Sequence, residues 1–160
     1  MTVIIRKIRT ALQREYLKAG GIQIQAAINQ AEENLGALAD QSFDEIDQTI
    51  DLIAQIAADP RRRPTTNELL RIHALVNVML GACAATDTPG LVDTLYAVAH
   101  LVAGLLATDT WIEGTLTPAV NLLRLVRRGV LSPEEVQALI VGIDQCTDRI
   151  RHHHQLVNGS

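Results

Sequence analysis

Apolar residues recur every three or four positions along almost the whole chain. This spacing lines up one face of an α-helix, whereas a half-buried strand alternates every second residue. The segments with helical spacing are about 2–18, 22–38, 42–59, 65–85, 88–107, 117–129 and 132–152. No alternating segment of useful length lies between them. The pattern therefore predicts an all-α fold, an up-down bundle of five or six helices with short loops and an N-terminal helical arm.

Residues with capping chemistry mark where these helices are expected to begin. In a capping box, a Ser or Thr and a Glu three residues later each satisfy a backbone N–H at the helix start. Proline also suits the first helical position, where its missing N–H costs nothing. The predicted starts are Ser42 with Glu45, Thr65 with Glu68, Thr88 with Pro89, Thr117 with Pro118, and Ser132 with Pro133 and Glu135. We expect an N-terminal arm or hairpin over 1–38, a bundle over 39–152 and a flexible tail over 153–160.

Composition narrows the classes of function. Apolar residues make up 48% of the chain and aromatic residues only 2%, so the core consists of Ile, Leu, Val and Ala. The net charge of −4 repels a phosphate backbone, which argues against nucleic-acid binding. No uninterrupted apolar run approaches the roughly 20 residues of a membrane span, and the first residues lack a secretory signal pattern. We expect a cytoplasmic protein without stable membrane insertion, in which Cys83 and Cys146 are reduced thiols.

Charge is segregated along the chain. Residues 1–18 contain five basic residues and one acidic residue, and residues 19–59 contain eight acidic residues and no Lys or Arg. This charge pattern leaves three alternatives for the basic amphipathic N-terminus. It packs on its own bundle, it packs on a second copy of the chain, or it lies on an anionic membrane. We expect a homodimer, and if the acidic stretch of one chain faces the basic arm of another, salt weakens the association.

Motifs for catalysis or metal binding are weak. The chain has no serine nucleophile elbow and no glycine loop that would cradle a phosphate. His152, His153 and His154 are adjacent, so they splay around a helix instead of facing one ligand site, and we assign them to the exposed tail. The run Arg61–Arg63 either grips a phosphate or an acidic partner, or is a solvated loop. No metal and no cofactor are expected.

His100 is the most informative polar residue. At 100° per residue, eight apolar residues of the segment 89–107 fall within one broad arc: Leu91, Val92, Leu95, Val98, Ala99, Val102, Leu105 and Leu106. His100 lies off that arc, and the residues grouped with it are Asp93, Ala97, Ala103 and Gly104. An exposed imidazole among small neighbours is accessible to a bulky phosphate, and a histidine side chain is substantially neutral and nucleophilic near pH 7.

The run Ala99-His100-Leu101-Val102-Ala103-Gly104 resembles the A-H-x-x-K-G signature of histidine phosphotransfer domains. These are four-helix bundles that relay phosphate between receiver domains. The resemblance implies that His100 accepts phosphate, while a receiver domain supplies Mg²⁺ and the catalytic carboxylates. This chain departs from the signature at Ala103, where the family has a Lys that offsets phosphate charge.

Two further resemblances concern other residues. The run from His73 to Asn77 resembles the H-x-x-x-N pattern of one class of sensor-kinase dimerisation helices, which makes His73 an alternative phosphoacceptor. A partly buried histidine bonded to a neighbour is the competing interpretation. The region 91–144 resembles small helical proteins encoded with chemotaxis and two-component genes in α-proteobacteria, which implies a signalling context.

The sequence thus leads to two hypotheses. In the first, the chain is a two-component or chemotaxis signalling protein, a histidine phosphotransfer or receiver-docking module centred on His100. In the second, it is a non-catalytic adaptor or dimerisation protein that binds a partner through the small-residue face around Asp93, Ala97, Ala103 and Gly104.

Overall fold

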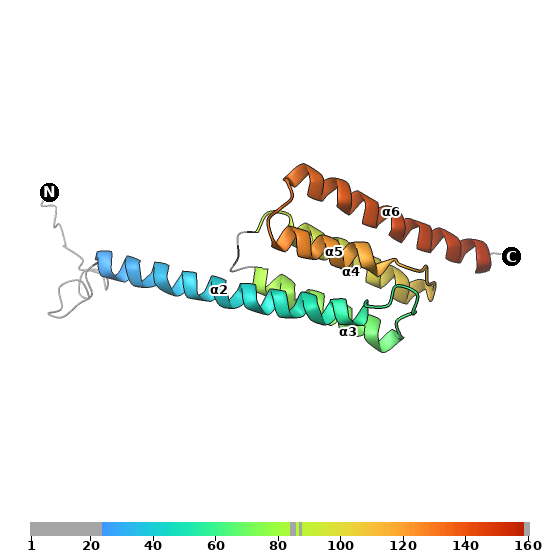
Figure 1. The fold of residues 1–160 in the computed structure, drawn as a ribbon, viewed down its shortest axis with the longest axis horizontal. Helices are drawn as coiled ribbons and strands as arrows, with labels where there is room; N and C mark the ends of the chain where they lie inside the picture. The colour runs from blue at the N-terminus through green and yellow to red at the C-terminus, as the bar shows by residue number, and fades with distance from the viewer. Residues whose placement is uncertain (1–23, 84–85, 87, 159–160) are drawn as a thin grey trace, which may run out of the picture. The chain divides into compact units, whose positions relative to one another are not determined.

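The structure is a computed structural model that describes residues 24–83, 86 and 88–158. Its regular elements in those residues are all helices, which confirms the predicted all-α class (Figure 1). They are α2 (Ile24–Ile56), α3 (Thr66–Ala82), α4 (Leu91–Thr108), α5 (Leu116–Arg127) and α6 (Pro133–Asn158). The helix expected over 2–18 lies outside the described residues.

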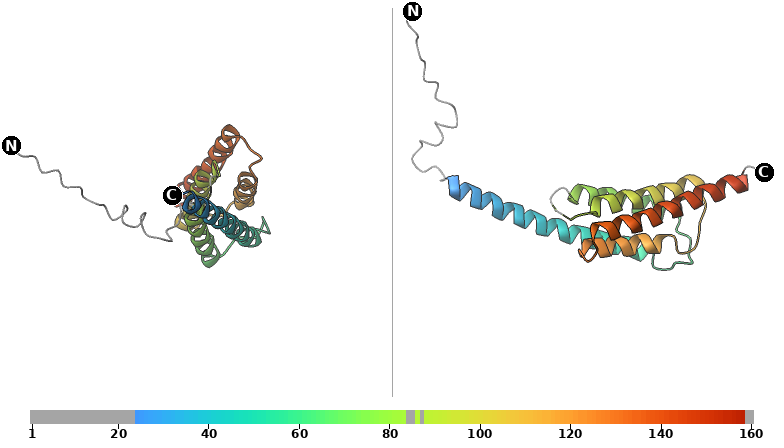
Figure 2. Two further views of the ribbon diagram at one scale, coloured as in Figure 1. Left: turned by 90° about the vertical axis from the view of Figure 1, so that its left-hand side faces the viewer. Right: turned by 90° about the horizontal axis from the view of Figure 1, so that it is seen from above.

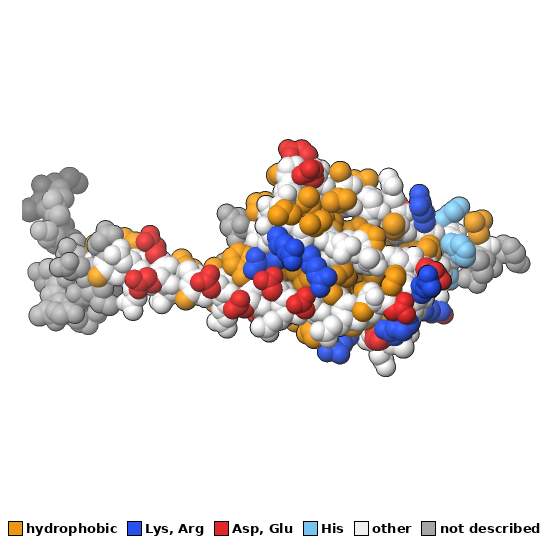
Figure 3. Space-filling view, viewed as in Figure 1, with side chains coloured by type: hydrophobic (Ala, Val, Ile, Leu, Met, Phe, Trp, Pro, Cys, Tyr) orange, Lys and Arg blue, Asp and Glu red, His pale blue; other side chains and the backbone are white. Residues whose placement is uncertain are grey.

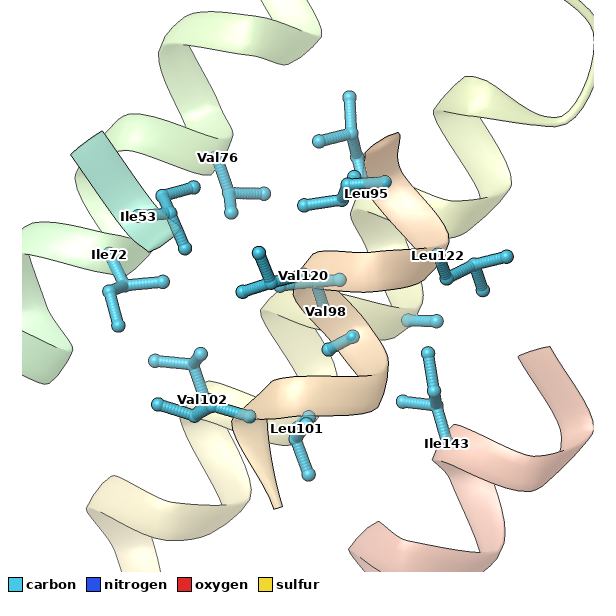
Figure 4. Close-up of a cluster of buried hydrophobic side chains, with 14 of the residues drawn as sticks. Ile53, Ile72, Val76, Leu95, Val98, Leu101, Val102, Val120, Leu122 and Ile143 are labelled. Carbon is cyan, nitrogen blue, oxygen red and sulfur yellow. The ribbon is translucent and has the colours of Figure 1, made fainter. Parts of the chain in front are cut away.

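The chain divides into two compact units, Met1–Ala37 and Leu38–Ser160. In the second unit α4 is the central helix, because it contacts α3, α5 and α6 (Figures 1 and 2). The C-terminal part of α2 adds Ile46, Ile50 and Ile53 to the same core. Figure 4 shows how the buried side chains meet around α4: Leu95, Val98, Leu101 and Val102 face Ile53, Ile72, Val76, Val120, Leu122 and Ile143.

The central position of α4 explains its composition. Among the described helices, α4 is the one that is long and apolar enough to cross a membrane by length and composition alone. In the folded chain 56% of this segment is buried by the surrounding protein. A helix that packs against neighbours on several sides must be apolar around most of its circumference. The core of the bundle therefore accounts for the hydropathy of α4.

Two predicted capping boxes are present. At the start of α3, the Thr65 hydroxyl accepts from the Glu68 N–H at 3.2 Å, and the Glu68 carboxylate accepts from the Thr65 N–H at 2.7 Å. At the start of α6, the Ser132 hydroxyl accepts from the Glu135 N–H at 3.2 Å, and Glu135 accepts from the Ser132 N–H at 2.8 Å. Both pairs satisfy backbone donors that the helix itself leaves free.

Other predicted boundaries are wrong. Residue Ser42 starts no helix, because α2 continues through it and its side chain is buried. No proline lies between 38 and 42, and Gly36 costs a helix only about 1 kcal/mol, so nothing ends the helix there. At the other end of the chain, α6 extends to Asn158 and includes the His152–His154 run that we assigned to a tail.

The starts of α4 and α5 also differ from the prediction. Gly90, with a φ of 77°, is the N-cap of α4, so Thr88 and Pro89 precede the helix. Helix α5 begins at Leu116, which places Thr117 and Pro118 inside its first turn. A proline is tolerated throughout the first turn because those N–H groups have no helical acceptor. The position of a proline in the sequence therefore predicts the start of a helix only to within one or two residues.

The capping box at α3 predicts a pH dependence of stability. Arg62 donates to both carboxylate oxygens of Glu68, at 2.9 and 3.0 Å. Hydrogen bonds from Arg62 and from the Thr65 backbone lower the pKa of Glu68 to about 2. Because this pKa lies below its unfolded value, the stabilisation is complete above about pH 4.5 and is lost as pH falls through about 2.

We therefore expect Glu68→Gln to be less stable than the wild type at pH 7, with a deficit that shrinks as pH falls below about 4.5 and vanishes below about pH 2. Urea unfolding followed by circular dichroism across this range measures the difference. Glu113→Gln, at an exposed position, is the control. A Glu68→Gln deficit that stays constant down to pH 2 would contradict the assignment.

Candidate functional site

His100 is exposed and lies at a groove between α4 and α6. The groove has a volume of about 490 Å³. Its lining comes from one face of each helix: Asp93, Tyr96, Ala97 and His100 on α4, and Gln137, Ile140 and Asp144 on α6. These positions recur at three, four and seven residues, which places them on one side of a helix. The groove is therefore built from two rigid elements of the same unit.

The charge of this groove is negative. Asp93 and Asp144 are both exposed at its lining, and Gln137 Nε2 donates to Asp93 Oδ2 at 3.5 Å. No Lys or Arg belongs to the lining among the residues that the structure describes. The two exposed carboxylates of the lining attract a cationic group and repel an approaching phosphate. Chemically, the groove offers one nucleophilic ring, the Tyr96 phenol and two hydrogen-bond-accepting carboxylates.

The small residues around His100 do not form an open patch. Ala103 and Asp93 are exposed as expected, but Ala97 and Gly104 are buried. A Cβ built on Gly104 would lie 3.2 Å from the Thr147 Cγ2 of α6, so the glycine is where the two helices approach closely. The prediction that Ala97 and Gly104 face solvent is wrong, because α6 of the same chain covers them.

The other histidines lie elsewhere. His73 is half-buried on α3, and Asn77 Nδ2 lies 3.3 Å from its Nδ1, within hydrogen-bonding distance. His152 and His153 are exposed on α6. Across residues 24–83, 86 and 88–158, no group of three His, Cys, Asp or Glu side chains could hold a metal ion. Cys83 is buried, which raises the pKa of its thiol, and both cysteines are free.

The arginine run has structural partners. Arg62 is bonded to Glu68, and Arg63 forms an ion pair with Asp109 and donates to the Asp109 carbonyl at 3.0 Å. The Arg62 contact joins the loop before α3 to α3 itself, and the Arg63 contacts join that loop to the end of α4. The guanidinium groups of Arg62 and Arg63 are therefore bonded to other residues of the same fold.

Two further arginines form ion pairs between α5 and α2. Arg124 pairs with Asp51 at 3.0 Å and Arg127 with Asp47 at 2.9 Å. The Arg127 guanidinium also lies 4.2 Å from the centroid of the Phe43 ring, a cation–π contact. Figure 3 shows the blue arginines next to the red carboxylates on this face. Part of the acidic stretch is thus neutralised within the bundle, a contact that sequence reasoning missed because its partners lie 73 and 80 positions apart.

An apolar groove of about 380 Å³ lies between α5 and α6, with α4 at its floor. It is lined by Leu101, Thr115, Pro118, Asn121, Leu122, Leu125, Ala138, Leu139, Gly142, Ile143 and Cys146. Sequence reasoning missed it because its side chains have the spacing of ordinary core residues. Leu125 and Leu139 in this lining are more than a third exposed, but that exposure is visible only in the structure.

Comparison with known proteins identifies no relative: no protein-family model, no curated protein and no solved structure matches this chain. The comparisons therefore add no support to the family resemblances of residues 99–104 and 91–144, which are based on the sequence of those residues alone.

Proposed function

We propose that this chain is a cytoplasmic signalling module that docks a receiver domain of a two-component or chemotaxis system, with His100 as its phosphoacceptor. It acts as an up-down bundle with an N-terminal arm. The observation that carries the proposal is the exposed imidazole of His100 in the middle of α4, beside a groove of about 490 Å³. Because the other faces of α4 are buried, the helix holds the ring in place while a partner approaches.

The proposed step is the transfer of a phosphoryl group from a receiver aspartate. A neutral ring nitrogen of His100 attacks the phosphorus, an N–P bond forms, and the P–O bond to the aspartate breaks. The aspartate leaves as a carboxylate. Ala103 stands where the resembling family has its Lys, and Asp93 and Asp144 line the groove. The positive charge that offsets the phosphate must therefore come from the partner and its bound Mg²⁺.

The test is the transfer of label from a ³²P-phosphorylated chemotaxis-type receiver domain. We expect acid-labile, alkali-stable label on the wild type, complete loss of label in His100→Gln and unchanged label in His73→Gln. His73 is the matched control because it is a histidine of the same bundle, half-buried beside Asn77. Label that persists in His100→Gln, or that disappears in His73→Gln alone, would contradict the assignment to His100.

A second candidate is a non-catalytic adaptor that uses the same groove. The acidic lining favours it, because Asp93 and Asp144 suit a partner segment rich in Lys or Arg. Its surface is the one that α6 leaves open, with Asp93, Tyr96, His100 and Ala103 exposed. Receiver binding without label, weakened by Asp93→Asn and Asp144→Asn and by added salt, would favour the adaptor over phosphotransfer.

A further inference from the structure

The N-terminal part of α2 presents an apolar stripe to solvent. Within the unit Met1–Ala37, Ile24 is 62% exposed, Ile28 45% and Leu35 66%. Ala31 lies between them on the same face and is also exposed. Single exposed apolar residues are ordinary, but a continuous line of them on one helix face marks an interaction surface.

The spacing of this stripe is that of a coiled coil. The steps from residue 24 to 28, 31 and 35 are four, three and four, and Leu38 continues the series in the sequence. Apolar residues at alternating steps of four and three form the a and d positions of a heptad, with a period of 3.5. Isolated helices of this length are marginal in water, so burial of the stripe against a partner would stabilise the segment.

The charge pattern favours a second copy of the same chain as that partner. With Ile28 and Leu35 at a and Ile24 and Ala31 at d, the flanking e and g positions include Ala27, Glu32 and Asn34. In a parallel, in-register pair, g of one helix faces e of the next heptad in the other, so Glu32 faces Ala27. Glu33 falls at f and points outward. No like charges meet across the seam, and the stripe is self-complementary under two-fold symmetry.

We propose that residues 24–37 form a parallel two-stranded coiled coil with the same segment of a second copy of this chain. The seam covers only two heptads, so the dimer dissociates on dilution. This inference is independent of the role of His100. The competing occupants of the stripe are residues 1–18 of the same chain, whose apolar residues also recur every four positions, and an unrelated protein.

The first test is the mass of the full-length protein in solution. Sedimentation equilibrium is expected to give a dimer at high concentration that dissociates on dilution. Ile28→Glu is expected to give a monomer at every concentration, because it places two carboxylates in the seam. Gln30→Glu adds the same charge at the outer c position and is expected to leave the dimer intact. Both variants are expected to melt like the wild-type protomer, since both positions are exposed.

The second test detects directly which residues of the two copies lie next to each other. Ala31→Cys in a Cys146→Ser background is expected to form an intermolecular disulfide on mild oxidation, because equivalent d positions face each other in a parallel pair. Gln30→Cys is expected to cross-link far more slowly. A wild type that is monomeric at all concentrations would overturn the proposal and assign the stripe to another occupant. A dimer unaffected by Ile28→Glu, or Ala31→Cys chains that fail to cross-link, would also overturn it.

Discussion

Leu101→Ala is expected to lower the free energy of unfolding by roughly 2–5 kcal/mol, the range for a leucine deleted from a packed core. Leu101 lies on α4 among the buried side chains of Figure 4 and is fully buried. It also lines the apolar groove between α5 and α6. Its removal leaves a cavity beneath two helices that pack against α4 from different directions. Urea unfolding of the two proteins, followed by circular dichroism, measures the loss.

Leu139→Ala is the matched control for this prediction. Leu139 lines the same groove from α6 but is 44% exposed, so its truncation removes less buried surface. We expect a loss below about 1 kcal/mol, in line with partial burial at about 25 cal/mol per Å². Equal losses of unfolding free energy for the two variants would contradict the full burial of Leu101.

The features that the sequence predicted well are those set by neighbouring residues. The all-α class follows from three- and four-residue spacing, and the boxes at Thr65 and Ser132 involve residues only three positions apart. The same rule failed at Ser42, where the local pattern is equally good. There the helix continues because no residue nearby breaks it and because Ile46, Ile50 and Ile53 are buried from the same helix.

The candidate site was predicted only in part, and α4 shows why. A helical wheel assumes one apolar arc, which correctly places His100 in solvent but also places Gly104 there. Because α4 contacts three helices, Leu101 and Gly104 are buried outside that arc. Small residues are ambiguous in such a wheel, since they suit both a water-facing patch and a close helix contact. The pairs Arg124–Asp51 and Arg127–Asp47 join α5 to α2 and have no signal in either segment alone.

Gly90→Ala is expected to lower the free energy of unfolding by roughly 2–5 kcal/mol, through two separate effects. The φ of Gly90 is 77°, a left-handed conformation in which any Cβ is strained. A Cβ at this position would also lie 2.9 Å from the Val136 Cγ1 of α6. Val136 is buried in the first turn of α6, and a β-branched side chain in a helix has one strongly preferred rotamer, so it cannot turn away.

Two further variants separate the backbone strain from the clash. Gly114 has the same φ of 77° with nothing within 4 Å of a built Cβ, so Gly114→Ala is expected to cost about 1–2 kcal/mol from strain alone. In a Val136→Ala background, Gly90→Ala is then expected to cost about as much as Gly114→Ala, and the double-mutant cycle gives the clash energy as the coupling. Gly90→Ala and Gly114→Ala variants of equal stability, measured by urea unfolding, would show that α6 does not press on the N-cap of α4. The packing of α6 against α4 would then differ from the one described above, and so would the groove at His100.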